Sequence, residues 1–284
     1  MTLKEWRQLG SEILSKAGLA DAPQEAKWLL AAAIGRDSSF ITLNPSYLVS
    51  AVEEQKIQEW LNRRSEGEPL SRLKGRREFW SLPFYLNEHT LDPRSDTEVL
   101  IEGVLKWVGE QKAAPWTILD LGTGSGCILI SLLHELPNAI GVGVDINEGA
   151  LSMALHNAIL NGVNLRASFR QGNWAENLKG SFDIIVSNPP YIPLAHKDTL
   201  SKDVVSFDPP QTLFGGEDGL MCYRILAQEI KPLLAPRGLA IFELGEGQRK
   251  DVEILFQQAG FKSLFTLFDL AGIERAIGFD LFRN

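Results

Sequence analysis

The sequence predicts an α/β protein in which a mostly parallel sheet with an antiparallel edge pair follows a small helical domain and a β-hairpin connector. Apolar residues recur at helical spacing from about residue 2 to residue 64. After residue 115, apolar strands alternate with amphipathic helices, which is typical of a parallel sheet covered on both faces. The last two strands have no helix between them, so we expect an antiparallel pair at one sheet edge.

The helical domain is predicted to span residues 1–75. It breaks at "GLADAP", where Asp21 or Pro23 can open a helix, and at "LNPS", residues 43–46. The apolar positions with helical spacing are Trp6, Leu9, Ile13, Leu14, Ala26, Leu29, Leu30, Ala33, Val52, Ile57, Trp60 and Leu61.

Residues 76–94 form the predicted connector. Aromatic and polar positions alternate here, as at Phe79, Trp80, Phe84 and Tyr85, which indicates a short hairpin at roughly 76–91. Six basic residues from Arg63 to Arg77 make the only basic cluster of the sequence. They are either a solvated linker or a surface that contacts a partner.

Residues 95–284 form the third predicted domain. Its strands are expected within 116–122, 139–145, 166–174, 182–191, 238–245, 261–270 and 275–282. Its helices are expected within 125–136, 147–162, 219–234 and 247–260.

Composition is that of an ordinary globular protein, with 44% apolar and 23% charged residues. Residues 1–94 contain 13 basic and 13 acidic residues, so the net charge of -8 belongs to residues 95–284. An acidic domain is a poor partner for a phosphate backbone, and we therefore expect no direct nucleic-acid binding. The sequence has neither a signal peptide nor a long apolar segment, and a monomer in the cytoplasm is expected, without membrane association.

The two cysteines, Cys127 and Cys222, lie far apart and outside any C-x-x-C pattern. They indicate neither a disulfide framework nor a metal site.

The first strand of the third domain runs into "ILDLGTGSGC", in which Gly122, Gly124 and Gly126 permit a tight turn before a helix. Such a turn makes a binding crevice at the carboxyl end of the strand, where we expect a nucleotide-type ligand. The dinucleotide fingerprint fails because Cys127 stands at its third glycine, and the phosphate loop lacks its lysine. A tight turn without a ligand is the alternative interpretation.

Two further strand ends add polar groups to the same rim of the sheet. Asp145 ends the second strand, where a carboxylate can accept hydrogen bonds from both ribose hydroxyls. Asn173 and Trp174 end the third strand, where an amide can bind an adenine edge and an indole can cover its face. Taken alone, Asp145 could equally cap a helix and Trp174 could pack within a loop.

The fourth strand ends in "VSNPPYIP", where two prolines stop both strand and helix. The side-chain oxygen of Asn188 and the carbonyl of Pro189 then form two acceptors that suit one planar NH2 group, and Tyr191 offers a flat surface for it. A conjugated NH2 nitrogen is a poor nucleophile and must be held in line with a reactive carbon such as a methyl sulfonium. This site needs no His, Cys or Ser nucleophile.

With these residues in place, the chain resembles the class I S-adenosylmethionine-dependent methyltransferases with an N-P-P-Y motif. Within them it is most similar to the release factor glutamine methyltransferases, the HemK/PrmC type. The resemblance runs nearly end to end, through "GRREFWSLPFYLNEHTLDPRSDTEVLIE", "ILDLGTGSGCILISL", "FDIIVSNPPYIP", "FGGEDGLMCYRIL", "FELGEGQ" and "FDLAGIERAIG". It implies a Rossmann-like class I methyltransferase sheet.

The resemblance also implies an activity: methylation of the side-chain amide nitrogen (N5) of the glutamine in the Gly-Gly-Gln loop of peptide-chain release factors, with S-adenosyl-L-homocysteine as the other product. It implies that the helical domain grips the release factor. The residues implied to contact S-adenosylmethionine are Gly122, Thr123, Gly124, Ser125, Gly126, Asp145, Asn173, Trp174 and Asn188, and those implied to hold the glutamine are Asn188, Pro189, Pro190 and Tyr191.

The chain departs from the family in two places. The family commonly has I-P-R-P-E-T-E where "LDPRSDTE" has Asp92, Ser95 and Asp96, and Glu-Pro where "FDPPQTLFGG" has Asp208 and Pro209. The main alternative function is methylation of adenine N6 or another nucleic-acid amine, because a flipped adenine presents the same NH2 geometry. A nucleoside-binding module without activity is a further alternative.

Overall fold

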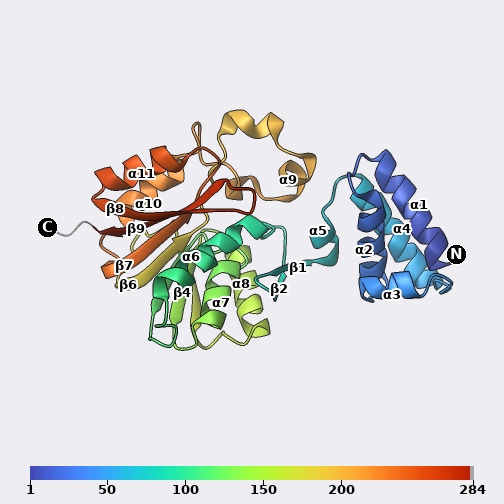
Figure 1. Ribbon diagram of the computed structural model, residues 1–284, viewed down its shortest axis with the longest axis horizontal. Coiled ribbons are helices and arrows are strands. Elements are labelled where there is room, and N and C mark those ends of the chain that lie inside the picture. The colour runs from blue at the N-terminus through green and yellow to red at the C-terminus, as the bar shows by residue number, and fades with distance from the viewer. Residues whose placement is uncertain (282–284) are drawn as a thin grey trace. The chain divides into compact units, whose positions relative to one another are not determined.

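The computed structural model describes residues 1–281, which form two compact units (Figure 1). The first unit comprises residues 1–75 together with 202–207, and the second comprises 76–201 and the chain from 208 onward. Residues 282–284, which end the predicted domain 95–284 and include Phe282 of its last predicted strand, lie outside the described residues. The division into three domains stays a prediction.

The first unit is helical, as predicted for residues 1–75, whereas the helix at residues 202–207 was not predicted. Its helices are α1 (Leu3–Lys16), α2 (Ala22–Ala33), α3 (Ser38–Leu43), α4 (Ala51–Ser65), α5 (Leu70–Lys74) and α9 (Lys202–Phe207). Capping boxes at Thr2 and Ser50 start α1 and α4, because each hydroxyl accepts from an amide one turn ahead. Val52 is an exception to the predicted apolar face, since it is 80% exposed in the first turn of α4.

The predicted hairpin is present in the second unit. Strands β1 (Arg76–Phe79) and β2 (Leu82–Tyr85) pair antiparallel, with Phe79 opposite Leu82. Trp80 and Ser81 form the turn with φ of 51° and 58°. Both central residues of a type I′ turn require positive φ, and here neither is glycine.

The second unit contains a seven-stranded sheet in the order β5-β4-β3-β6-β7-β9-β8. The first five strands in this order are parallel, and β9 is antiparallel to both β7 and β8. This confirms the predicted antiparallel edge. The strands are β3 (Thr117–Leu121), β4 (Ile140–Asp145), β5 (Ala167–Gln171), β6 (Phe182–Ser187), β7 (Leu234–Glu243), β8 (Phe261–Phe268) and β9 (Glu274–Leu281).

Helices cover both faces of this sheet, with α6, α7 and α8 on one side and α10 and α11 on the other (Figure 1). The predicted helices are α7 (Cys127–Glu135), α8 (Glu148–Leu160), α10 (Met221–Glu229) and α11 (Arg249–Gln258). The sequence did not predict α6 (Glu98–Val108) or the 3-10 turns η1 (Ser95–Thr97), η2 (Leu194–Thr199) and η3 (Pro210–Thr212).

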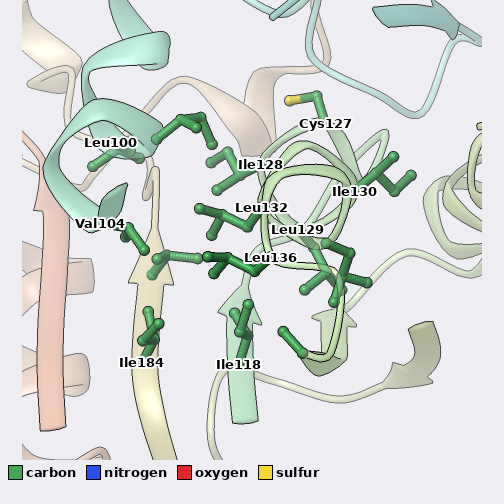
Figure 2. Close-up of a cluster of buried hydrophobic side chains, with 14 of the residues drawn as sticks. Leu100, Val104, Ile118, Cys127, Ile128, Leu129, Ile130, Leu132, Leu136 and Ile184 are labelled. Carbon is green, nitrogen blue, oxygen red and sulfur yellow. The ribbon is translucent and has the colours of Figure 1, made fainter. Parts of the chain in front are cut away.

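Successive residues of each central strand enter opposite cores. Ile118 and Ile184 pack under α6 and α7, where Figure 2 shows Leu132 of α7, Leu136 at its C-cap and Val104 of α6 reaching over the two strands. Their neighbours Leu119 and Ile185 belong to the core under α10 and α11. Burial on both faces explains why these strands are largely apolar, with Asp120 of β3 as an exception.

Candidate functional site

The carboxyl ends of β3, β4, β5 and β6 border a cavity of about 260 Å³ in the second unit. Most of the predicted site residues line it: Gly122, Thr123, Gly124, Ser125, Asp145, Asn173, Trp174, Asn188 and Pro190. Gly126, Pro189 and Tyr191 are not part of the lining found within residues 1–281. The roles of all these residues stay predictions, but one rim brings most of them together.

The glycine loop between β3 and α7 has the predicted tight backbone. Gly122, Gly124 and Gly126 have φ of 74°, 55° and 79°, a region that L side chains rarely adopt. Asp145 fastens this loop to β4, because its Oδ2 accepts from the Gly124 amide and its Oδ1 from the Asn147 amide, both at 2.9 Å. Each oxygen keeps a lone pair for a ligand.

Asp145 is partly buried, and burial raises its pKa while the amides of Asn147 and Gly124 oppose that rise. A carboxylate held by two amides beside a cavity fits the hydroxyls of a ribose. The residues present therefore suit the nucleoside part of S-adenosylmethionine.

Trp174 closes one side of the cavity. Its φ is 51°, and its ring packs so closely on the loop that a β-carbon at Gly122 would lie 3.3 Å from the indole Cζ3. Asn173 beside it is exposed and faces the same cavity.

Asp120, which was not predicted as a site residue, lies beneath the glycine loop. Its Oδ2 accepts from the Thr123 hydroxyl at 2.6 Å, while no described residue donates to its Oδ1. Because the side chain is fully buried, its pKa rises to about 7.

The N-P-P-Y segment is held on several sides. Asn188 donates from Nδ2 to the Thr97 hydroxyl at 3.1 Å, and the Tyr191 hydroxyl donates to Oε1 of Glu243 at 3.1 Å. Gln248 donates from Nε2 to the Tyr191 carbonyl at 2.9 Å, and Ile192 forms a parallel bridge with Phe214. Burial, together with the Glu243 charge, raises the pKa of Tyr191 far above its ordinary value, so this phenol stays protonated.

Glu243 ends β7 and is 2% exposed. Burial raises its pKa to about 7, while Thr97, Tyr191 and the Arg275 guanidinium favour the ionised form. Thr97 and Glu243 both lie in segments that resemble the family, but no role was predicted for either residue. The sequence feature that could have pointed to them is their position in the family-like segments "RSDTE" and "FELGEGQ".

The two departures from the family pattern meet in one ion-pair cluster. Asp208 accepts from Arg94 at 2.6 Å and from the Asp92 amide at 3.3 Å, and Asp92 itself accepts from Arg77 at 3.2 Å. The changed segment still reaches the cavity, because Pro93 and Thr97 line it.

Cys127 and Cys222 are free, buried and part of the cavity lining. Burial raises their pKa to about 12 and about 11. Near neutral pH they therefore offer thiols, which are weak nucleophiles, rather than thiolates.

No helix within residues 1–281 combines the length and apolar character that a membrane span requires.

Comparison with known proteins covers both units. The family model of the PrmC N-terminal domain matches residues 5–75, and that of the methyltransferase small domain matches residues 89–206. A release factor glutamine methyltransferase of Rhodospirillum rubrum is 43% identical over 271 residues, which are 94% of this chain and 82% of that protein. One of Bradyrhizobium diazoefficiens is 43% identical over 266 residues, 93% of this chain and 90% of that protein.

Among solved structures, a ribosomal protein L11 methylase of Lactobacillus delbrueckii subsp. bulgaricus superposes with a TM-score of 0.51 at 19% identity. The match covers 67% of this chain and 81% of that protein, and it supports the predicted methyltransferase sheet. The identity and coverage of the two relatives confirm the resemblance found in the sequence: this chain belongs to the family of release factor glutamine methyltransferases.

Proposed function

We propose that this enzyme methylates the side-chain amide nitrogen of the glutamine in the Gly-Gly-Gln loop of peptide-chain release factors. One observation carries the proposal: Asn188 of the N-P-P-Y segment and the glycine loop from Gly122 to Ser125 line the same cavity. A group suited to an NH2 nitrogen and a group suited to a nucleoside thus share one space. Membership of the family supports this choice of substrate.

S-adenosylmethionine supplies an electrophilic methyl group when bound, and it leaves as S-adenosylhomocysteine. Asp145 would hold the ribose hydroxyls, Trp174 and Asn173 the adenine, and the loop from Gly122 to Ser125 would approach the rest of the cofactor. Gly126 lies at the start of α7, where it shapes this loop.

The substrate amide is held by acceptors of this chain. Thr97 occupies the Nδ2 end of Asn188, so the Oδ1 end remains for a substrate N–H. The Pro189 carbonyl would take the second N–H, with Pro190 and Tyr191 shaping the walls. Two acceptors draw electron density toward the nitrogen and fix its orientation, and fixed orientation accounts for a large part of such a rate enhancement.

The helical unit would bind the release factor, and its exposed apolar side chains suit protein contact: Trp28, Leu43, Leu48 and Val52. We further propose that the enzyme acts as a monomer in the cytoplasm, where release factors work.

Methylation of a nucleic-acid amine is less well supported. Several members of the basic cluster already pair with acids: Arg63 with Glu68 at 2.7 Å and Arg64 with Glu25 at 3.1 Å. Little unpaired charge from these two residues remains to attract phosphates.

The test is transfer of labelled methyl from S-adenosylmethionine to three substrates: purified release factor, its loop Gln→Ala variant, and DNA that contains adenine. Mass mapping then locates the label. Label on the loop glutamine alone is the expected result. Label on DNA, or on the Gln→Ala variant at the same level, would contradict the proposal.

A further inference from the structure

Buried hydrogen-bonding groups form a chain behind the N-P-P-Y segment. At one end Asn188 donates to Thr97, and at the other end Tyr191 donates to Glu243. Thr97 and Glu243 are each 2% exposed, and an interaction of the Thr97 hydroxyl with the Glu243 carboxyl favours the ionised carboxylate. Glu243 is thus linked to the side chains of both Asn188 and Tyr191.

The direction of each hydrogen bond follows from what each group can donate. An ionised carboxylate only accepts, and a hydroxyl has a single hydrogen to donate. When Thr97 gives that hydrogen to Glu243, its oxygen can only accept, so the end of Asn188 that faces it must be the NH2 group. The oxygen end of Asn188 is then the one available to the cavity that Asn188 lines.

Burial raises the pKa of Glu243 to about 7, so the ionised carboxylate that this arrangement requires predominates above that pH. Among the described residues no group donates to its Oε2, so the few remaining donors must satisfy this buried carboxylate. Burial opposes its charge, Arg275 supports it and Asp96 opposes it. Arg275 is itself fixed by Asp269 at 2.8 Å.

We infer that Glu243 and Thr97 are positioning residues that determine specificity, because they make Asn188 present an acceptor oxygen to the substrate. The inference rests on the proposed function and adds to it a reason for choosing glutamine over glutamate. A glutamine side chain offers hydrogens to Oδ1, whereas a glutamate side chain of the same shape offers only lone pairs. A site built for one hydrogen-bonding pattern rejects the other, since a mismatch leaves buried polar groups unpaired.

The experiment compares two peptides that carry the release-factor loop, one ending in Gly-Gly-Gln and one in Gly-Gly-Glu. Their affinities are measured on the full chain with S-adenosylhomocysteine present, together with the methylation rate of the Gln peptide. The wild type should bind the Gln peptide roughly tenfold or more tightly, the effect of one mismatched buried hydrogen bond.

Three variants test this series of hydrogen bonds from Asn188 to Glu243. Thr97→Val keeps the shape but removes the hydroxyl, so the side-chain amide of Asn188 can rotate by half a turn. The preference for the Gln peptide should then fall to within about threefold, and the methylation rate should drop roughly tenfold or more. Thr97→Ser keeps the hydroxyl and should restore most of both. Glu243→Gln can donate as well as accept, and it should weaken the preference in the same way. Thr117→Val is the matched control, because Thr117 lies at the amino end of β3, opposite the end that borders the cavity, and its hydroxyl binds Asp183. This variant should change neither the peptide preference nor the methylation rate.

If Thr97 served packing alone, Thr97→Val would behave more like the wild type than Thr97→Ser, because Val fills the space of Thr better than Ser does. The inference is therefore overturned if Thr97→Val keeps the wild-type preference, or if it loses affinity for both peptides equally while the wild type methylates the Gln peptide normally. A wild type that methylates no loop glutamine would instead contradict the proposed function, and the inference with it.

Discussion

Asn157 pairs with the main chain of Tyr85 in both directions, donating to its carbonyl at 3.0 Å and accepting from its amide at 2.8 Å. The same Nδ2 group donates to the Ser125 carbonyl at 2.9 Å. A fully buried side chain on α8 therefore takes the place of a strand beside β2 and joins the hairpin to the glycine loop.

Asn157→Ala should lower the free energy of unfolding by roughly 1–3 kcal/mol, because it leaves buried main-chain groups unpaired. Urea denaturation measures this loss. Asn161→Ala is the control: its amide donates to the Pro83 carbonyl at 3.0 Å near the surface, where water can replace it, and a change within about 0.5 kcal/mol is expected. Equal losses in the two variants would argue against the role given to Asn157.

Asp145→Ala should weaken S-adenosylmethionine binding by about 1–3 kcal/mol through loss of charged hydrogen bonds. The loop would also lose the acceptor of its Gly124 amide. Titration calorimetry gives the affinity, with Asp251→Ala on the exposed side of α11 as the control. An unaltered affinity in Asp145→Ala would reject a cofactor role for this carboxylate.

Asn188→Ala should leave the fold and cofactor affinity largely intact but reduce turnover roughly 10²-fold, the usual effect of removing one group that polarises the reacting centre. Single-turnover methylation of release factor is the measurement. Asn138→Ala removes an exposed amide that binds the Ala113 carbonyl and should have no effect. Normal turnover in Asn188→Ala would remove this residue from the mechanism.

Asp120 makes stability depend on pH. Burial raises its pKa from 3.8 to about 7, so between these values the folded protein holds a proton that the unfolded chain has released. Its contribution is complete below pH 3.8 and disappears as the pH rises through about 7. In the apo enzyme, the free energy of unfolding should fall as the pH rises toward about 7. Asp120→Asn should reduce the slope of that fall by up to about 1.4 kcal/mol per pH unit. Urea titrations at pH 5, 6 and 7 measure both slopes, and parallel curves would show that Asp120 is ionised in the fold.

Gly219→Ala should disturb the N-P-P-Y segment, because the added β-carbon would lie 2.3 Å from the Tyr191 carbonyl oxygen. We expect methylation to fall roughly tenfold or more, as for other displacements of a reacting group. Gly272→Ala shares the positive φ, at 79° against 76°, but its β-carbon meets nothing within 4 Å. It should cost stability while sparing activity, and similar activity loss in both variants would point to backbone strain instead.

The fold was largely predictable because burial on both faces makes successive residues of the central strands apolar, as at Ile118 and Leu119. Val52 was wrongly grouped with the apolar face of its helix. It precedes Ile57 by five residues, which places it on a different side of α4 from Ile57 and Leu61, and it is exposed.

The cavity lining was predictable to the extent that strand ends of a parallel sheet meet at one rim. Thr97 and Glu243 escaped prediction because their importance lies in contacts with Asn188 and Tyr191 from distant parts of the chain. Thr97 lies on a short turn before α6, and Glu243 reads as the end of one more apolar strand. Spacing along a sequence carries no information about such partners.

The order of the sheet also affects how the protein is made. Strand β8 precedes β9 in the chain, yet β9 lies between β7 and β8 and is the neighbour through which β8 joins the sheet. During synthesis β8 must wait, with its edge unpaired, until β9 has left the ribosome. This interval is a period of exposure to aggregation, because an unpaired strand edge can join another chain. This chain therefore depends on prompt synthesis of β9 once β8 has emerged, in the same process in which its proposed substrate acts.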